Sequence, residues 1–490
     1  MVFNIFFPAS DSYFRLKNSY FNGGICISVS GTKLEFYGAA GGVTGSHMVL
    51  ETDGRRIGID AGLFQGLESE SNWSGFGHDV RKLSSLLLTH AHVDHSGRIP
   101  LLVKQGFGGS VYSTSATADL CDLMLRDSAH LMIEQELRES RHPEQIQAPH
   151  RPALYNEEEA LQSLRRFRGV GYGEAVDLDG PSCRFLDAGH ILGSSMLELT
   201  LGKRKLVFGG DLGRPNAPFL RDPERVRSAD WLVLESTYGD RDHEDRANRG
   251  KQLLHIVRET VEKGGNVVIP AFAVGRAQEI LYEINPFAES GALKGVPCFL
   301  DSPMAISASQ IYRRHPECFD KETLDMISSG DHPLDFPGIR ISRSTDESKA
   351  INRHASPHIV ISANGMATGG RILHHIAHNI SRPESTIIFA GFQAEGTLGR
   401  AMLNGAKKVR IMGREYEVRA RLETMNAFSA HAGRSEIMKW LRGFDDFPPR
   451  VFLNHGEPQA TRSLAEAINQ EFGAKVTIPR AKESYQLNSA

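Results

Sequence analysis

Three histidines and one aspartate within six positions form a compact group of side chains suited to metal binding. The segment THAHVDH places His90, His92, Asp94 and His95 directly behind an apolar run that predicts a buried strand. Side chains two residues apart on an extended strand point to the same side, so His90 and His92 face one point. The helix start predicted at Asp94 turns the other two toward it. Because imidazole and carboxylate groups are common zinc ligands, the segment predicts a metal site.

Further ligands must come from distant strand ends, because this cluster alone leaves the metal short of partners. His190 in LDAGHILGSS, Asp211 in KLVFGGDLGR and His455 in VFLNHGEP each follow a predicted strand. Taken singly, each is explained equally well by a polar residue that caps a turn. Together they complete a two-metal site in which Asp211 bridges the ions. The predicted ligands are His90, His92, His190 and Asp211 for one ion, and Asp94, His95, Asp211 and His455 for the other.

The elements that must position these residues alternate between short β-branched runs and helix-length segments. This alternation predicts a layered α/β architecture with its chemistry at strand ends. The polar stretch 134–159 is expected to be a long exposed connection with solvated charges. Strands are predicted within 56–62, 82–89, 183–188, 205–211, 230–236, 265–272, 296–303, 357–364, 385–392 and 450–457, and helices over 277–284 and 461–472.

Composition narrows the classes of protein. A chain of 490 residues, 40 % of them hydrophobic and 23 % charged, is long enough for two or more domains. The net charge of −3 excludes a globally basic polyanion binder, so any nucleic-acid contact is a local groove. Five cysteines without a CxxC pair favour a reducing, cytoplasmic location and argue against cysteine-ligated zinc. The sequence contains no apolar run long enough for a membrane span, and its start lacks the basic region of a signal peptide.

Several motifs resemble one enzyme superfamily. THAHVDH, AGHILGS and FGGDLG are similar to motifs of the metallo-β-lactamase superfamily. Beyond Asp211 the resemblance narrows to its β-CASP branch, whose members process nucleic acids. Glu235 in LVLESTYGDR, His431 in NAFSAHAGR and His455 in NHGE match the motifs A, B and C of that branch. The resemblance runs from about Leu34 to the C-terminus and looks closest to prokaryotic relatives of the endonuclease subunit of the cleavage and polyadenylation specificity factor.

The resemblance implies a metallo-β-lactamase αββα sandwich with an inserted α/β β-CASP domain. Asp211 and His455 are expected in one site although 244 residues separate them, which leaves room for a complete inserted domain. The cleft between the two domains is then the expected substrate channel. The predicted division is an N-terminal extension over 1–31, the sandwich over 32–234 and 425–490, and the insertion over 235–424.

The ligand set and the resemblance together predict a metal-dependent ribonuclease. Two ions about 3.5–4 Å apart hold a bridging hydroxide that attacks phosphorus, and they stabilise the charge on the phosphoryl oxygens. Asp94 helps to orient the hydroxide. The family pattern makes His431 the general acid and Glu235 the acceptor that stabilises its charged form. The expected cofactor is two Zn²⁺ per chain, with Mn²⁺ as the alternative.

Three residues are predicted to bind the RNA substrate. Arg276 in AVGRAQE lies near a predicted helix start, where a guanidinium and backbone N–H groups can engage phosphate. Ser362 and Asn364 lie at the lip of the glycine-rich loop SANGMATGGR. The basic stretch 407–423 is expected to be an exposed β-ribbon without a direct role.

Two other functions compete with this prediction. A small-molecule hydrolase of the thioesterase or lactonase kind uses the same metal cluster but needs neither the insertion nor Glu235 and His431. A catalytically inactive nucleic-acid-binding scaffold is expected to have lost ligands, whereas all of them are present here. The expected partner is single-stranded RNA. No association with a membrane is expected. DNA as substrate, endonuclease or 5′-exonuclease preference, and a homodimer are left open by the sequence.

Overall fold

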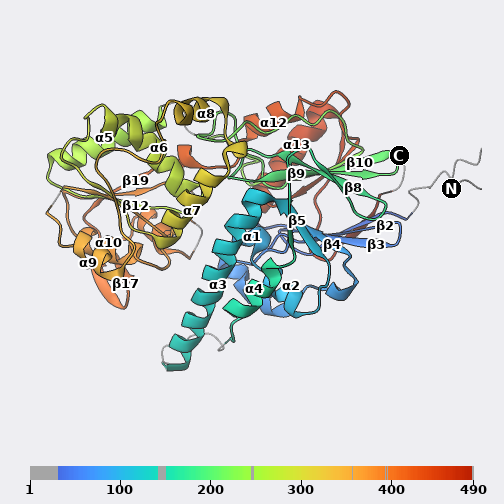
Figure 1. The fold of residues 1–490 in the computed structure, drawn as a ribbon, viewed down its shortest axis with the longest axis horizontal. Helices are drawn as coiled ribbons and strands as arrows, with labels where there is room; N and C mark the ends of the chain where they lie inside the picture. Colours follow the sequence, from blue (N-terminus) through green and yellow to red (C-terminus); the bar gives the residue numbers. More distant parts are fainter. Residues whose placement is uncertain are drawn as a thin grey trace, which may run out of the picture.

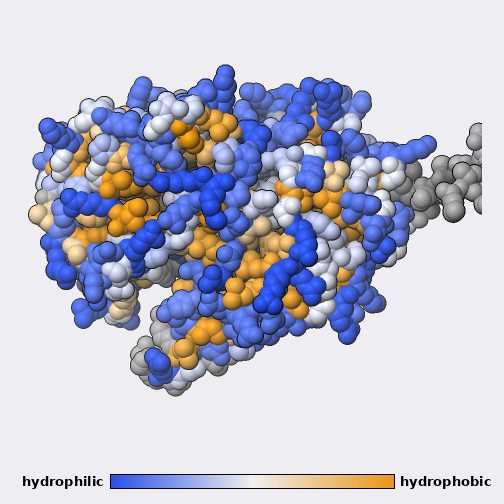
Figure 2. Space-filling model, in the orientation of Figure 1, coloured by the Kyte–Doolittle hydropathy of each residue, from blue (hydrophilic) through white to orange (hydrophobic). Residues whose placement is uncertain are grey.

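A computed structural model describes residues 31–141, 151–243, 248–355, 357–391, 393 and 396–487. Residues 1–30 of the expected N-terminal extension lie outside the described residues. Two lobes lie side by side along the long axis of the molecule (Figure 1). Hydrophilic side chains cover most of the face that Figure 2 shows.

One lobe contains two sheets that are packed face to face. The first runs parallel from β3 to β6 and is extended by antiparallel strands at the β3 edge. Its strand order is β22 (Ser484–Gln486), β1 (Lys33–Phe36), β2 (Met48–Thr52), β3 (Arg55–Ile59), β4 (Ser85–Leu87), β5 (Ser110–Thr114) and β6 (Phe167–Val170).

The second sheet joins segments that are far apart in the sequence. Strand β20 pairs in parallel with β11, so that Glu235 lies opposite Asn454. The order is β21 (Lys475–Thr477), β20 (Arg450–Asn454), β11 (Trp231–Glu235), β10 (Arg204–Phe208), β9 (Ser195–Leu201), β8 (Ser182–Asp187) and β7 (Ala175–Asp177). Apolar side chains, among them those of Phe36, Phe185 and Phe452, fill the space between the sheets.

Helices cover the outer faces of both sheets. The face of the first sheet packs on α1 (Val93–Ser96), α2 (Ile99–Lys104), α3 (Ser115–Arg141) and α4 (Glu157–Leu164). The second sheet packs on α12 (Arg434–Leu441) and α13 (Pro458–Phe472). The longer helices bury apolar side chains on one side, such as Leu464 and Ile468 on α13. The lobe is therefore the predicted αββα sandwich.

The other lobe is built on a parallel sheet that lies in the sequence between β11 and β20. Its order is β14 (Ile339–Ile341), β13 (Cys298–Leu300), β15 (Ile359–Ser362), β12 (Val267–Pro270), β16 (Thr386–Phe389) and β19 (Arg421–Thr424). Strands such as β12, VVIP, are buried along their whole length, as expected for a parallel sheet covered on both faces.

The helices of this lobe divide between the two faces of its sheet. One face packs on α5 (Arg249–Glu262), α6 (Arg276–Glu289) and α7 (Pro303–Arg314), with α8 (Lys321–Ser328) beside them. The other packs on α9 (Thr345–Ile351), α10 (Ile372–Asn379) and α11 (Leu398–Leu403). The predicted fold class, a sandwich with an inserted α/β domain, is confirmed. The domain limits at residues 235 and 424 stay a prediction.

Two local expectations were wrong in part. The stretch 134–159 is not one exposed connection, because α3 continues to Arg141 and α4 begins at Glu157. The C-terminal half of α3 projects away from the sandwich, so a largely polar sequence there forms a solvated helix (Figure 1). In the basic stretch 407–423, β17 (Lys408–Ile411) and β18 (Arg414–Glu417) form a two-stranded ribbon, but Arg421 already belongs to β19 of the large sheet.

Candidate metal centre and catalytic pair

The THAHVDH segment follows β4 and runs into α1. Strand β4 ends at Leu87, and His92 is the residue that precedes α1. Asp94 and His95 lie on the single turn of α1. This short element follows from the sequence, because Gly97 ends α1 and Pro100 lies in the first turn of α2, where a proline is tolerated. The strand end and the helical turn thus direct all four side chains toward one region, as predicted.

Glycines allow the distant loops to approach this turn. A methyl group on Gly213, in the turn that follows β10, would lie 1.9 Å from the carbonyl oxygen of Gly189. A methyl group on Gly62 would lie 1.6 Å from the carbonyl oxygen of Asp94. No side chain fits at either point. Gly213 and Gly62 are therefore required for these loops to approach one another.

The first predicted ligand group is assembled around one carboxylate oxygen. His90 Nε2 lies 3.5 Å and His190 Nε2 3.6 Å from Asp211 Oδ2. His92 Nδ1 lies 3.1 Å from His90 Nε2 and 3.3 Å from His190 Nε2. One donor atom from each of these four residues falls within 4.8 Å of the others. The spacing is that of a group able to enclose one ion.

The second predicted group meets the other oxygen of the same carboxylate. Asp211 Oδ1 lies 3.3 Å from His95 Nε2 and 3.5 Å from His455 Nδ1. His455 Nε2 lies 3.2 Å from His95 Nε2 and 3.5 Å from Asp94 Oδ2. The structure thus brings all the sequence-predicted ligands together, with Asp211 between the two groups. That these residues hold metal stays a prediction.

Burial sets the charge states of the donors. It lowers the pKa of His90 and His190 well below the usual histidine value, and that of His92 to about 4. These rings are therefore neutral at pH 7, the state in which imidazole binds a metal ion. Burial alone would raise the pKa of Asp211, but neighbouring charges, foremost that of His455, outweigh it and lower the pKa well below its usual range. The neutral rings of His90, His92 and His190 beside an ionised carboxylate suit a divalent cation. His95 differs, because its burial is outweighed by the charges of Asp211 and Asp60, which raise its pKa well above the usual histidine value.

Two further observations test whether a metal fits. His190 Nδ1 and Asp211 Oδ1 are buried and make no hydrogen bond within the described residues. A cavity of about 20 Å³ is lined by His95, His455 and Glu235, among others, which is room for roughly one water or ion. Buried polar atoms without hydrogen bonds are uncommon in folded proteins. The donor set therefore fits a metal ion better than it fits a purely structural cluster.

Asp60 supports the centre and was not identified from the sequence. Its Oδ2 lies 2.7 Å from His95 Nδ1 and accepts a hydrogen bond from Ser46 Oγ at 3.2 Å. Its Oδ1 accepts from the Thr89 backbone N–H at 2.9 Å. A carboxylate behind a metal-binding histidine fixes the ring and its tautomer. The available signal was the segment RIGIDAG, in which Asp60 follows a predicted strand just as Asp211 does.

Glu235 and His431 form a pair beside the ligand groups. Glu235 ends β11, and its Oε1 and Oε2 lie 3.1 and 3.0 Å from His431 Nδ1. The Leu212 backbone N–H donates to Glu235 Oε1 at 2.6 Å. His431 Nδ1 lies 4.0 Å from Asp211 Oδ2, which places the pair next to the predicted bridging ligand. Burial favours a low pKa for His431, but the charge of Glu235 outweighs it and raises the pKa to about 9.

Arg276 begins α6, as the sequence predicts, but its guanidinium faces the protein interior. It is 9 % exposed, it hydrogen-bonds to the carbonyl oxygen of Ala390, and its Nε lies 3.5 Å from Glu279 Oε2. These contacts place the side chain between α6 and the loop after β16. A role of Arg276 in RNA binding stays a prediction.

Ser362 is the last residue of β15 and Asn364 lies on the loop that follows, so both lie at the start of the glycine-rich stretch, as predicted. The Ser362 hydroxyl is buried and donates to the carbonyl oxygen of Asp301 at 2.7 Å. The half-buried Asn364 accepts from the Met366 backbone N–H at 2.8 Å and donates to Thr368 Oγ1 at 2.9 Å. Both side chains thus contribute to the shape of the loop, and substrate binding by either stays a prediction.

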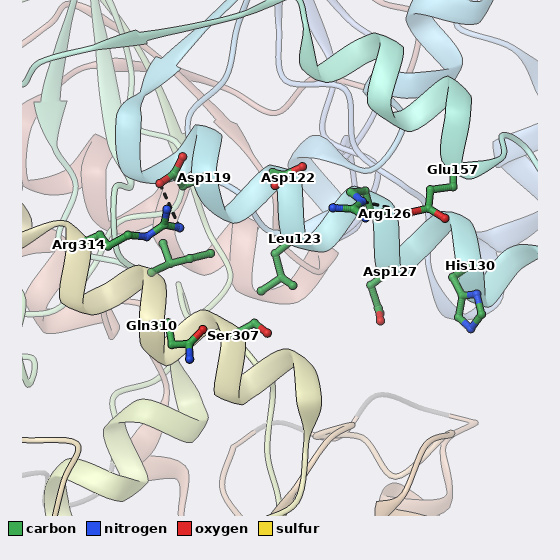
Figure 3. Close-up of a pocket in the computed structure, with 11 residues that line it drawn as sticks. Asp119, Asp122, Leu123, Arg126, Asp127, His130, Glu157, Ser307, Gln310 and Arg314 are labelled. Carbon is green, nitrogen blue, oxygen red and sulfur yellow. Dashed lines mark hydrogen bonds and ion pairs between the residues drawn. The ribbon is translucent and has the colours of Figure 1, made fainter. Parts of the chain in front are cut away.

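A groove of about 800 Å³ also lies between the lobes, bounded by α3 and α7 (Figure 3). Arg314 Nη2 lies 3.4 Å from Asp119 Oδ2, and Arg126 Nη2 lies 3.0 Å from Glu157 Oε1. These pairs engage both arginines of the lining, which also contains Asp122 and Asp127. An acidic lining repels phosphate. The metal centre, whose ligands do not line this groove, is therefore the candidate functional site.

The fold and the site define a metallo-hydrolase of the metallo-β-lactamase type. The family model of the metallo-beta-lactamase superfamily matches residues 40–258, and that of the Beta-Casp domain matches residues 277–402. The model of the Zn-dependent metallo-hydrolase RNA specificity domain matches residues 415–479. Together with the relatives described next, these matches show that the chain belongs to the β-CASP branch of this superfamily.

Similar proteins come from bacteria and archaea. The chain is 37 % identical to ribonuclease TTHA0252 of Thermus thermophilus, over 91 % of this chain and 98 % of that protein. It is 30 % identical to transcription termination factor FttA of Methanothermobacter thermautotrophicus, over 90 % of this chain and 70 % of that protein. A solved structure of a protein of unknown function from Enterococcus faecalis V583 matches 93 % of this chain and 99 % of its own, with a TM-score of 0.54 and 11 % identity. That likeness supports the fold.

The structure also tests the expectation about membranes. Within the described ranges, no helix is both long and apolar enough to cross a bilayer. The cytoplasmic location stays a prediction.

Proposed function

We propose that this protein is a metal-dependent ribonuclease that hydrolyses RNA phosphodiester bonds. The observation that supports this most directly is the Glu235–His431 pair, which lies beside the ligand groups at the boundary between sandwich and inserted domain. A ribonuclease name among the relatives and an RNA specificity domain over 415–479 agree with it. A small-molecule hydrolase needs the metal ligands but neither this pair nor the insertion.

The metal is held, in this proposal, by the two groups of donors described above. Zinc suits imidazole and carboxylate donors best, and manganese is the alternative. When bound, two divalent ions lower the pKa of a water molecule and stabilise the charge that builds on the phosphoryl oxygens. Asp94, with one oxygen 3.5 Å from His455, holds the attacking water in line with the departing oxygen.

His431 acts as the general acid. A departing 3′ oxygen needs a proton, and its delivery by a positioned side chain typically contributes a factor of about 10²–10⁴. Glu235 accepts the hydrogen bond from His431 Nδ1, which keeps the ring oriented and favours its protonated form. The Leu212 backbone N–H in turn holds Glu235 in place. The proton thus passes from His431 to the leaving group.

The substrate is single-stranded RNA, bound in the cleft where sandwich and inserted domain meet. The loops after β12 and β15 of the inserted domain, with Arg276, Ser362 and Asn364, form the proposed far wall of that cleft. In the predicted division of the chain at residues 235 and 424, the proposed metal ligands belong to the sandwich and this wall belongs to the insertion. Backbone N–H groups of the glycine-rich loop 362–371 are suited to phosphate.

A cleavage assay with two labels tests the proposal. Purified protein is incubated with single-stranded RNA of defined length that carries a 5′ label in one sample and a 3′ label in the other. Metal content is measured on the same preparation, and His431→Ala is assayed in parallel. We expect about two metal ions per chain and fragments that the variant does not release. Internal fragments identify an endonuclease, and released mononucleotides identify an exonuclease. Intact RNA after incubation with metal-loaded wild type contradicts the proposal.

A further inference from the structure

One exposed aromatic ring lies on the turn between β12 and α6. Phe272, in the segment PAFAVGR, is 41 % exposed. Among the large hydrophobic side chains exposed in the described part of the chain, the only other aromatic one is Trp73, which is 37 % exposed. A solvent-facing phenylalanine gives up the free energy of burying its ring. A ligand that covers the ring would recover this free energy, so the position of Phe272 relative to the metal centre matters.

On one side, this turn lies against the loop that carries His190, one of the predicted metal ligands. A methyl group on Gly275, three residues after Phe272, would lie 3.2 Å from Cγ2 of Ile191, the residue that follows His190. The first turn of α6 is fastened to the same region by a buried ion pair, in which Arg214 Nη2 lies 3.0 Å from Glu279 Oε1. The ring therefore belongs to the part of the inserted domain that borders the metal centre.

On the other side, the ring contacts the glycine-rich loop. The Ala271 backbone N–H donates to the Ser362 carbonyl oxygen at 3.0 Å, which ties the two loops together. A methyl group on Gly365 would lie 3.0 Å from Phe272 Cδ2 and 3.1 Å from Cε2. Gln393 Nε2 donates to the Gly365 carbonyl oxygen at 3.1 Å and holds the loop there. One edge of the ring is thus packed while the side chain as a whole stays largely open to solvent.

We propose that Phe272 is a stacking platform for one nucleobase of the substrate, next to the phosphodiester that is cleaved. This inference rests on the proposed ribonuclease function and adds a base subsite to it. Every nucleobase has a π face, so stacking on an aromatic ring binds single-stranded nucleic acid with little sequence preference. A base in a duplex is already stacked on both sides and cannot use the ring. The subsite therefore favours unpaired RNA.

The position of the ring favours a base over the other parts of a nucleotide. Phosphate is attracted to cations and N–H groups, and a phenyl ring supplies neither. The turn that carries the ring approaches Ile191 through Gly275, and the ring itself contacts the glycine-rich loop at Gly365. A strand whose phosphate reaches the metal ligands can therefore place a neighbouring base on Phe272, while the glycine-rich loop receives the adjoining backbone.

The test combines a substitution with a scan of abasic nucleotides. Cleavage of single-stranded RNA is measured for wild type, Phe272→Ala, Phe272→Tyr and the matched control Trp73→Ala. Each protein receives a series of RNAs in which one abasic nucleotide is moved through the positions that flank the cleaved bond. Binding of the same RNAs is measured in a His431→Ala background, so that the substrate stays intact. Melting temperatures check that every variant is folded.

We expect Phe272→Ala to raise KM for intact RNA by about 5- to 150-fold, the loss typical of one base–aromatic stack, with kcat little changed. Phe272→Tyr restores KM, and Trp73→Ala leaves it unchanged. In wild type, one abasic position causes a similar loss of binding, and in Phe272→Ala that position causes no further loss. An unchanged KM, or an equal loss with every RNA in the series, overturns the stacking proposal. A wild type that neither binds nor cleaves RNA contradicts the ribonuclease proposal itself.

Discussion

Two buried aspartates in this molecule have similar positions and opposite surroundings. Asp211 follows β10 of the sandwich, and Asp301 follows β13 of the inserted domain. Asp301 accepts hydrogen bonds from Ser348 Oγ at 2.6 Å and Arg371 Nη1 at 2.7 Å, and its Oδ2 lies 2.7 Å from His375 Nε2. Asp211 is surrounded by histidine nitrogens at 3.3–3.6 Å, and its Oδ1 makes no hydrogen bond in the described parts of the chain.

The difference contrasts a carboxylate whose hydrogen bonds the protein itself supplies with one that we propose binds metal. Hydroxyl and guanidinium groups donate hydrogen bonds, so the protein itself satisfies Asp301. The neutral rings of His90 and His190 beside Asp211 direct lone pairs as well as N–H groups toward the centre. A buried polar atom that makes no hydrogen bond is costly. A bound cation satisfies the rings and the carboxylate together. The contrast predicts that substitution of Asp211 affects metal and activity, whereas substitution of Asp301 affects stability.

The largest expected effect comes from Asp211→Asn. The amide removes the negative charge that both ligand groups share, so we expect metal content to fall and RNA cleavage to be lost. The loss should exceed the factor of about 10²–10⁴ expected for a missing general acid. Metal analysis and cleavage assays on one preparation check this. Asp301→Asn is the matched control and should keep its metal. If both variants retain metal equally, the contrast drawn between the two aspartates is wrong.

His431→Ala should separate chemistry from metal binding. Because the ring contacts Glu235 and is not a predicted ligand, we expect full metal content together with a kcat about 10²–10⁴-fold lower. KM should change little, since the proton is needed only as the 3′ oxygen departs. Single-turnover cleavage at saturating RNA measures the step directly. Loss of metal in this variant would instead assign His431 to the ligand set.

Asp60→Asn tests the support behind one ligand. The carboxylate holds His95 Nδ1 at 2.7 Å and binds no metal in our proposal. Loss of such a supporting group typically weakens metal binding about 10–100-fold. Competition with a chelator of known affinity measures the change. Activity should recover when excess zinc is supplied, and Asp211→Asn should not recover under the same conditions.

The sequence predicts well which polar residues lie at the ends of strands. It predicts poorly which hydrogen bonds and contacts their side chains make. The strands before His90, Asp211 and His455 are present as β4, β10 and β20, because short β-branched runs followed by glycine and polar residues have few other structures. Asp60 was missed although it too follows a strand, since a single aspartate carries no spacing signal. The interior contacts of Arg276 could not be predicted either, because they depend on which backbone carbonyls the inserted domain places nearby.

The smallest expected effect concerns the acid stability of the inserted domain. Burial raises the pKa of a carboxyl group, but the hydrogen bonds of Asp301 with His375, Ser348 and Arg371 outweigh this and lower its pKa to about 2, from an ordinary value of 3.8. The folded protein therefore keeps Asp301 ionised at pH values where the unfolded chain binds a proton. This stabilisation is fully present above pH 3.8 and is lost as the pH falls toward 2. A shift of this size corresponds to about 2 kcal/mol of unfolding free energy.

Urea unfolding of wild type and Asp301→Asn at a series of pH values measures this contribution. We expect the difference in unfolding free energy to be constant between pH 5 and 7 and to shrink by about 2 kcal/mol as the pH falls from 5 to 2. Asp346→Asn, whose side chain is 96 % exposed, is the control. A difference that stays constant down to pH 2 would show that Asp301 gains nothing from its donors. The hydrogen bonds that Asp301 accepts would then not distinguish it from Asp211.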